Sequence, residues 1–439
     1  MIKRGRHPKI FFGWWMVLAS GILNFWAGGF GTFGFSALFK PIALELGFSR
    51  AATSVAASIR SVEGGFLSPV VGWLTDRFGP RWMVLSGVLI IGLSLILMNF
   101  INSLWAFILI WGILQGTGFT LGLHIPLDKA ITNWFVKKRG RALATKFVLG
   151  TALAVVLMVP IVAWLVSAQG WRMTCVTAGL VIWIIGLPLG WFFMKQRRPE
   201  YYGLLPDGAT TKETAGIPQI IDRGVKYAAE VHEIEFTLRQ AMMTRTYWLI
   251  MVAMAGFHLA SPIFLVHCMP FLTDMGIEPV KAAVIIGLMG IGVFPGAFIS
   301  MFVADRMKKE HLRFLLTGAY FLNVIGITAF LLNQTLAMVY PLFIFHHFAG
   351  GVTGSLSSVI LGRYFGRKAF ASIRGTLMMF MLPFSVVAPI YAGWVYDTNG
   401  SYIRVFLTCG LFLFLSAIII SLAFPPKPPA HITDIRKIV

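Results

Sequence analysis

Charged residues are scarce in this chain. Only 12% of its 439 residues are Asp, Glu, Lys or Arg, whereas 57% are hydrophobic. A soluble domain usually carries about a quarter charged residues, so this composition excludes a single water-soluble globule and requires lipid as the solvent. The net charge of +20 suggests an acidic partner, but the basic residues are distributed among short segments between apolar runs. We therefore expect a lipid bilayer as partner and no nucleic acid.

Cysteine is also scarce. The three cysteines, Cys175, Cys268 and Cys409, all lie within apolar stretches and have neither the spacing of a disulfide framework nor that of metal ligands. The sequence also lacks a nucleophile and base, or a ligand cluster, at a usable spacing. We therefore expect packing cysteines, no metal site, no cofactor and no enzymatic activity.

Apolar runs long enough to cross a membrane occur twelve times. A span needs roughly 20 mostly apolar residues, and membrane β-strands would be about ten residues long with alternating polarity. The first run continues beyond the length of a signal peptide, without a convincing cleavage site, so we expect it to be retained. The sequence thus predicts an all-α membrane protein with twelve transmembrane helices, at residues 12–39, 51–74, 82–100, 104–135, 142–168, 173–193, 247–271, 282–304, 312–332, 336–361, 375–395 and 402–424.

The connecting segments predict the orientation and the domains. With the N-terminus inside, 29 of the 37 Lys and Arg residues fall in cytoplasmic segments and five in outside loops, which the positive-inside rule requires. We expect both termini in the cytoplasm and a multi-pass protein of a bacterial or archaeal inner membrane. The domains are a six-helix bundle (1–194), a linker (195–246) whose residues 228–243 form an amphipathic helix, a second bundle (247–424) and a tail (425–439).

The two halves repeat. Pro41, Gly47 and Asp76 find counterparts 229 positions later, and Trp134 and Gly170 find similar residues 230 positions later. Because six helices cross the membrane an even number of times, both copies enter from the same side and form parallel repeats. Transporters with such repeats bind substrate near the midplane between the halves.

The segment GWLTDRFGPR (72–81) lies in the short loop after the second span. It resembles the G-x-L-x-D-R-x-G-R-R motif of the major facilitator superfamily, with Pro80 replacing one basic residue. The Asp76 carboxylate can face the positive N-terminal end of the eleventh helix, near Gly375. The alternative is a simple basic turn of the positive-inside kind. Residues expected to hold the cytoplasmic gate are Gly72, Asp76, Arg77, Gly79, Arg81, Arg139 and Arg141.

The segments NWFVKKRGRALA (133–144) and RYFGRKAFASIRG (363–375) resemble those of the monocarboxylate porter and oxalate:formate antiporter-like group. That group often binds a carboxylate with a cation in the eighth or eleventh span, yet 282–304 and 375–395 contain no charge here. The drug:proton antiporter pattern is also absent, because Gly112 stands in place of its Arg.

Polar residues within spans are costly and indicate functional sites. Arg60 and Glu63 lie three residues apart on one helix face, near the midplane. Arg60 is a candidate anion ligand and Glu63 a candidate proton site, whereas an internal ion pair that supports packing is the alternative.

Other intramembrane polar residues lie on the helices that line the cavity in this superfamily. Histidine changes charge near physiological pH, which suits proton coupling, although a hydrogen-bonded packing role is the alternative for each one. Candidate substrate-binding residues, besides Arg60, are Asn24, Gln115, His124, His258 and His346. Asp128 joins Glu63 as a candidate for proton coupling.

These features predict a monomeric secondary transporter of a small organic solute, most consistent with a monocarboxylate-like anion. Alternating access would be coupled to protons or to a counter-anion. The alternatives are an efflux transporter for amphiphilic compounds and a transporter-like sensor that binds without transporting.

Overall fold

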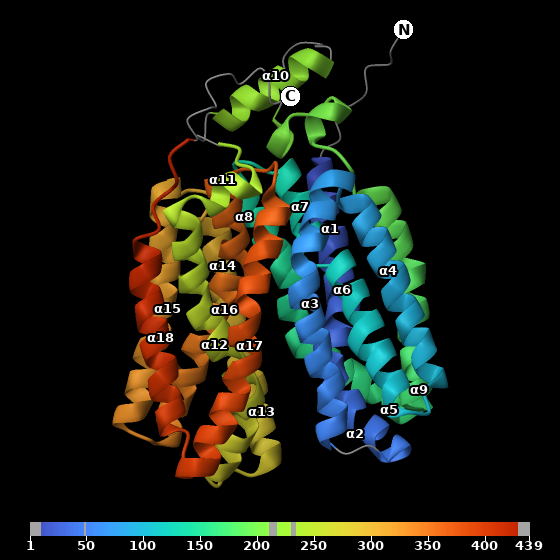
Figure 1. The fold of residues 1–439 in the computed structure, drawn as a ribbon, viewed down its shortest axis with the longest axis vertical. Helices are drawn as coiled ribbons and strands as arrows, with labels where there is room; N and C mark the ends of the chain where they lie inside the picture. The colour runs from blue at the N-terminus through green and yellow to red at the C-terminus, as the bar shows by residue number, and fades with distance from the viewer. Residues whose placement is uncertain (1–9, 48–49, 210–216, 230–233, 429–439) are drawn as a thin grey trace.

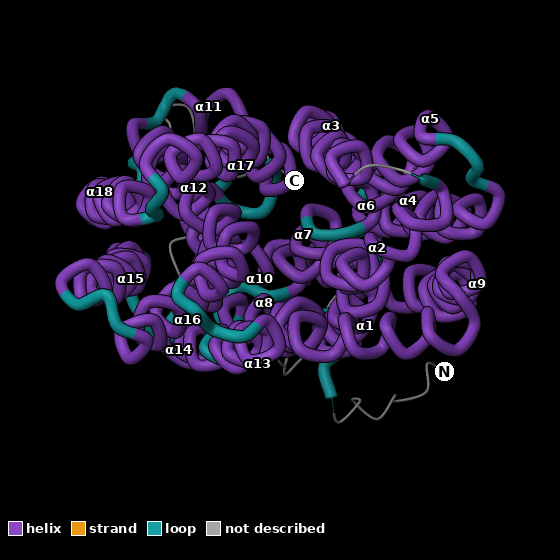
Figure 2. The backbone as a smooth tube through the Cα atoms, turned by 90° about the horizontal axis from the view of Figure 1, so that it is seen from below, coloured by secondary structure: helices purple, strands orange, loops and turns teal. Residues whose placement is uncertain are grey.

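The structure, a computed structural model, describes residues 10–47, 50–209, 217–229 and 234–428. Every regular element among these residues is helical, and the helices run roughly parallel to one another in two adjacent groups (Figures 1 and 2). This arrangement confirms the predicted all-α membrane protein. The first group contains α1 (Phe12–Leu23), α2 (Phe35–Leu46), α3 (Arg50–Phe78), α4 (Pro80–Leu97), α5 (Leu104–Phe107), α6 (Gln115–Gly122), α7 (Ile125–Trp134), α8 (Arg139–Phe147) and α9 (Leu153–Phe193).

The second group follows the linker. It contains α12 (Arg245–Asp274), α13 (Pro279–Gly290), α14 (Val293–Val303), α15 (Leu312–Leu332), α16 (Leu336–Phe365), α17 (Phe370–Asn399) and α18 (Ile403–Ser421). We call the groups the N-terminal and C-terminal halves. The described parts of the linker, residues 195–209, 217–229 and 234–246, lie at one end of the bundle, which we call the linker end (Figure 1).

Ten helical stretches in the described residues are long and apolar enough to span a membrane. The second and eighth predicted spans are not among them, for two different reasons. Helix α3 carries Arg60 and Glu63 in its middle, which lowers its hydropathy. The eighth span is divided at Gly292 into α13 and α14, and each part is too short alone.

Several spans are not regular α-helices. π-helical segments occur at Asn24–Gly28, Phe30–Gly34, Ile108–Leu114 and Val148–Ala152, in the first, fourth and fifth spans. The fourth span breaks again at His124, whose φ of 49° is unusual for a side chain with a Cβ. Because π segments are rare and often mark functional sites, these three spans are where the site should be sought.

Positive-φ glycines support the internal repeat. Gly47 and its counterpart Gly276 have φ of 66° and 82°, and Gly170 and Gly400 have φ of 76° and 64°. Each pair ends a span at the end opposite the linker, where only glycine turns the chain without strain. Gly170 separates the fifth and sixth spans, which otherwise continue as α9.

The linker differs from its prediction. Its helix is α10 (Ile217–Ala229), earlier than the expected 228–243, and a short α11 (Leu238–Met242) follows with a Thr237–Gln240 capping box. The amphipathic pattern at 228–243 was misleading because Thr237 begins a new helix in the middle of it. Residues 230–233 lie outside the described part of the chain.

Candidate functional site

Asp76, at the linker end of α3, contacts the beginning of α17 in the other half. Its carboxylate accepts hydrogen bonds from the Ser372 backbone N–H at 2.8 Å and from the Ser372 hydroxyl at 2.7 Å. The Ala371 N–H lies 3.4 Å away. A helix N-terminus carries unpaired N–H groups and partial positive charge, so a carboxylate stabilises it. The sequence placed Asp76 at the beginning of this helix near Gly375, and the contacts lie about one turn earlier, at Ala371 and Ser372.

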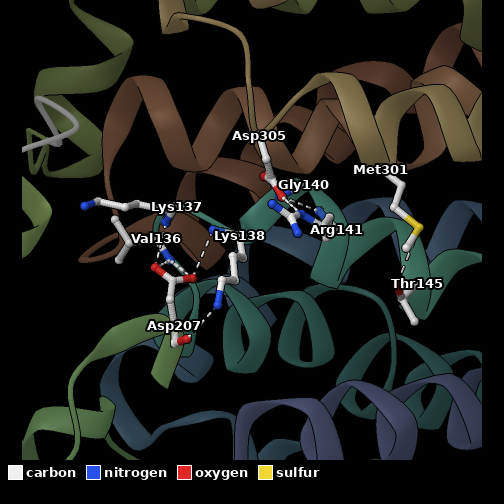
Figure 3. A network of polar contacts seen from close by, with 9 residues as sticks. All are labelled: Val136, Lys137, Lys138, Gly140, Arg141, Thr145, Asp207, Met301 and Asp305. Carbon is white, nitrogen blue, oxygen red and sulfur yellow. Dashed lines mark hydrogen bonds and ion pairs between the residues drawn. The ribbon is translucent and has the colours of Figure 1, made fainter. Parts of the chain in front are cut away.

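Asp305 makes the equivalent contact in the other direction, across to α8 (Figure 3). Its carboxylate accepts from the backbone N–H groups of Gly140 at 2.6 Å and Arg141 at 3.0 Å, and from Arg141 Nε at 3.1 Å. Burial raises the pKa of Asp305, while the N–H donors of Arg141 and Gly140 oppose that rise. Sequence analysis identified Asp305 only as the repeat of Asp76. The 229-residue offset between the halves also places Asp305 where its carboxylate accepts backbone N–H groups at the start of a helix in the other half.

Glycines allow these helices to approach closely. A Cβ on Gly72 would lie 2.3 Å from the Ala371 carbonyl oxygen, and one on Gly375 would lie 2.2 Å from the Ser68 carbonyl oxygen. A Cβ on Gly140 would likewise lie 2.7 Å from Asp305 Oδ1. Backbone of α3 therefore touches backbone of α17 across the two halves, which no residue larger than glycine permits. Gly79, with φ of 86°, turns the chain from α3 into α4.

The predicted gate arginines divide into two kinds. Arg141 pairs with Asp305, and Arg139 lies against Gly362 of α16, so both reach the other half. The Arg77 guanidinium instead lies 5.1 Å from the Trp73 ring centroid, and that of Arg81 lies 4.1 Å from the ring of Trp191. These two predicted gate arginines stack on aromatic faces of their own half.

Lys129, on α7, links the two halves at the same level. Its ammonium lies 2.6 Å from Asp76 Oδ1 and donates to the backbone carbonyl oxygens of Arg367 and Lys368. Lys129 lies within the fourth predicted span (104–135) and was not among the predicted site residues. Since it is buried, its charge requires this set of acceptors.

Asp128 lies one residue away, in a buried cluster contributed by both halves. It pairs with Lys146 Nζ of α8 at 3.1 Å and with Arg374 Nη1 of α17, and it accepts from the Ser358 hydroxyl of α16 at 2.8 Å. Arg374 is 6% exposed. Sequence analysis missed Arg374, because the eleventh span was taken to begin at Gly375, whereas α17 begins at Phe370. The statement that this helix lacks a cation is therefore corrected.

Arg60 and Glu63 of α3 bond to different neighbours. Arg60 donates to the Gly31 carbonyl oxygen, and its Nη2 lies 3.3 Å from the Thr32 hydroxyl, while its guanidinium stacks 4.5 Å from the Phe119 ring. Glu63 Oε1 accepts from the Thr117 hydroxyl at 2.7 Å. Each side chain thus connects α3 with another span.

Several buried polar atoms in the first, second and fourth spans have no hydrogen-bond partner among the described residues. They are Glu63 Oε2, Asn24 Oδ1 and both amide atoms of Gln115. Asn24 Nδ2 does donate to Thr151 at 2.8 Å, beside two of the π segments. Unsatisfied buried groups cost free energy, so they need an explanation such as a ligand.

His124 lies at the break of the fourth span, next to Phe119. Its ring is 5.1 Å from Phe119, the ring on which Arg60 stacks. Arg60 and His124 therefore lie against the same ring, whereas the Asp128 cluster joins α7 and α8 to α16 and α17.

The two histidines of the C-terminal half occupy other surroundings. The His346 ring stacks 4.0 Å from Phe264, and its Nδ1 lies 3.0 Å from Asn323 Nδ2. This enclosure favours packing within the C-terminal half over the predicted substrate contact. His258 is half-buried on α12, and its carbonyl oxygen accepts from the Ser385 hydroxyl.

The described residues contain no group of three or more His, Cys, Asp or Glu that could hold a metal ion. The three cysteines are buried and unpaired. Two helical halves that meet through exchanged carboxylates at one end, with partnerless polar groups between their spans, define a membrane transporter.

The chain belongs to the Major Facilitator Superfamily, because residues 21–381 match the model of that family. It is 22% identical to monocarboxylate transporter 13 of Rattus norvegicus, over 94% of this chain and 89% of the relative. It is also 22% identical to an uncharacterized MFS-type transporter, YcxA of Bacillus subtilis, over 90% of this chain and 91% of the relative.

Solved structures with the same fold include the transporter FucP in its outward conformation, with a TM-score of 0.68 and 12% identity. The match covers 93% of this chain and 98% of FucP. The proton:xylose symporter XylE matches with a TM-score of 0.64 and 15% identity, over 94% of each chain. This protein is a secondary transporter and not an enzyme.

Proposed function

We propose that this transporter carries a small organic anion of the monocarboxylate class. The observation that supports this proposal is a pair of buried cations, Lys146 and Arg374, that come from the two halves. Among the described residues, both pair with the same carboxylate, that of Asp128. One buried positive charge is thus left for a ligand, and buried charges need partners. The relatives named monocarboxylate transporters support the same class.

Movement of the halves would change this balance. Asp128 and Lys146 belong to the N-terminal half, whereas Arg374 belongs to the C-terminal half. When the halves separate at the linker end, Arg374 loses its carboxylate. Leaving one partner of a buried pair uncompensated costs about 3–5 kcal/mol. A substrate carboxylate at Arg374 would offset that cost. A proton bound to Glu63 or Asp128 would neutralise a carboxylate and so change the charge left to be balanced.

We propose that the linker end faces the cytoplasm of a plasma membrane and that the protein acts as a monomer. The described conformation is then closed at the cytoplasmic side. Its inter-half hydrogen bonds and ion pairs, among the described residues, all lie toward the linker end. The excess of Lys and Arg in the linker-side segments supports this orientation.

The test is uptake into proteoliposomes that contain the purified protein. Labelled lactate, pyruvate, formate and oxalate are offered with an imposed pH gradient, with internal unlabelled anion, or with neither. Accumulation driven by the gradient indicates proton symport, and uptake that needs internal anion indicates exchange. Absence of uptake of all four anions, in vesicles that transport an amphiphilic cation, would contradict the proposal in favour of efflux. Binding without any transport would indicate a sensor.

Variants then test the residues. Arg60→Ala should raise the KM for the anion about 10- to 100-fold, since a hydrogen bond to a charged group contributes roughly 1.5–3 kcal/mol. Glu63→Gln should abolish accumulation driven by the pH gradient while exchange continues. Arg404→Ala removes one exposed positive charge away from the site and serves as the matched control. An unchanged KM in Arg60→Ala would remove this residue from the site.

A further inference from the structure

The linker makes specific contacts with both halves at the linker end. Asp207, in its first part, is 3% exposed and accepts from three consecutive backbone N–H groups in the turn before α8. The distances are 3.2 Å from Val136, 2.8 Å from Lys137 and 2.9 Å from Lys138 (Figure 3). Asp207 has a φ of 61°, a conformation that Asp and Asn tolerate better than most residues.

Figure 3 shows Asp207 and Asp305 on two sides of the same turn. The Asp207 carboxylate accepts hydrogen bonds from the backbone N–H groups of residues 136–138, and the Asp305 carboxylate accepts from those of Gly140 and Arg141. The beginning of α8 is therefore held by one carboxylate from the linker and another from the C-terminal half.

The second part of the linker contacts the C-terminal half at the equivalent turn, between α16 and α17. The Phe236 N–H donates to the Phe365 carbonyl oxygen at 3.0 Å. A Cβ on Gly366 would lie 2.5 Å from the Ile234 carbonyl oxygen, so the linker backbone lies directly against this turn.

Two ion pairs join these parts. Arg198 of the first part pairs with Glu235 of the second. Glu200 of the first part lies 3.4 Å from Arg367 of the C-terminal turn, and Arg367 donates to the Asn133 carbonyl oxygen at 3.0 Å. Glu200 and Arg367 are both buried. The described parts of the linker thus make polar contacts with the N-terminal turn through Asp207 and with the C-terminal turn through Phe236 and Glu200.

We propose that the linker is a latch that holds the two halves together at the linker end, with Asp207 as the positioning residue. Separation of the halves moves the two turns apart, so the linker must release at least one of them. The latch favours the described conformation in the absence of any substrate, and the proposal is independent of what the transporter carries.

Spin labels at Phe192→Cys and Lys308→Cys, exposed positions on the two halves, report the separation at the linker end by pulsed EPR in nanodiscs. The native cysteines are buried, which limits background labelling. Without substrate, Asp207→Asn should raise the ratio of separated to joined molecules about tenfold. Asp222→Asn, which neutralises an exposed carboxylate of the same linker, should leave the ratio unchanged.

Equal distance distributions in Asp207→Asn and Asp222→Asn would overturn the latch. Glu235→Gln supplies a second test, because it breaks the Arg198 pair without touching the α8 turn, and it decides the matter if Asp207→Asn fails to fold. A shift in Asp207→Asn without any shift when Glu200→Gln and Glu235→Gln are combined, which removes both ion pairs, would refute a latch that joins the two turns. Since no substrate is present, these outcomes are separate from those of the transport assay.

Discussion

Gly72→Ala tests whether direct backbone contact between α3 and α17 holds the linker end closed. The added Cβ would lie 2.3 Å from the Ala371 carbonyl oxygen, whereas ordinary contacts begin at 3.4 Å. The helices must therefore move apart by about 1 Å, because a backbone oxygen cannot rotate away. Overpacking of this kind costs about 1–3 kcal/mol. The cost falls only on the joined conformation, so the ratio of separated to joined molecules should rise about 5- to 150-fold.

The assay is the distance between labels at Phe192→Cys and Lys308→Cys, measured by pulsed EPR. Gly318→Ala is the matched control, because Gly318 lies within α15 and a Cβ there meets nothing within 4 Å. This control carries the same change in helix propensity, which by itself stabilises. If Gly72→Ala and Gly318→Ala gave the same distance distribution, the close approach of α3 and α17 would not contribute to the gate.

Three further predictions concern single residues. Asp305→Asn should raise the separated fraction in the same EPR assay, because its three hydrogen bonds lose their charge, whereas exposed Asp397→Asn should not. Glu45, beyond the first span, has its pKa lowered chiefly by the hydrogen bond from Arg172. The ionised Glu45 carboxylate therefore stabilises the folded protein above pH 4.5, and this contribution is lost as the pH falls through the lowered pKa. Because Glu45→Gln removes the titrating group, the fall in Tm on acidification should be smaller in this variant. His124→Gly should unfold at a higher temperature than His124→Ala, because φ of 49° costs a residue with a Cβ about 1 kcal/mol or more.

The sequence predicts features that depend on length, charge or an internal offset. The number of spans follows from apolar run length, and the contact of Asp76 with α17 follows from its motif together with helix electrostatics. Its repeat, Asp305, could have been assigned the same contact from the offset of 229 residues.

Features that depend on helix boundaries or tertiary contact could not be predicted. Arg374 was counted with the loop because a cation at the end of an apolar run resembles a positive-inside residue. Asp207 lies in a segment rich in Gly and Pro, where no periodicity indicates what a carboxylate contacts. The π segments escaped detection because one extra residue in a fully apolar run leaves the hydropathy unchanged.

Three carboxylates accept backbone N–H groups at the turns before α8 and α17: Asp76, Asp207 and Asp305. The duplication of the halves explains Asp76 and Asp305, whereas Asp207 makes the two turns unequal. Asp76 and Asp305 each hold the first turn of a helix in the other half. Only one chain segment joins the halves, so Asp207 has no repeat, and it reinforces the α8 side alone.

This inequality predicts where the gate loosens first. At the α8 turn, five backbone N–H groups between Val136 and Arg141 donate to the carboxylates of Asp207 and Asp305. At α17, the Asp76 carboxylate accepts from the backbone N–H of Ser372 at 2.8 Å and from that of Ala371 only at 3.4 Å. Hydrogen–deuterium exchange should therefore be slower in a peptide covering residues 136–141 than in one covering 371–372. Asp207→Asn should reduce this difference, since it weakens only the first of these sites. Equal exchange of both peptides in the unmodified protein would mean that the linker carboxylate adds nothing to the strength of the α8 side.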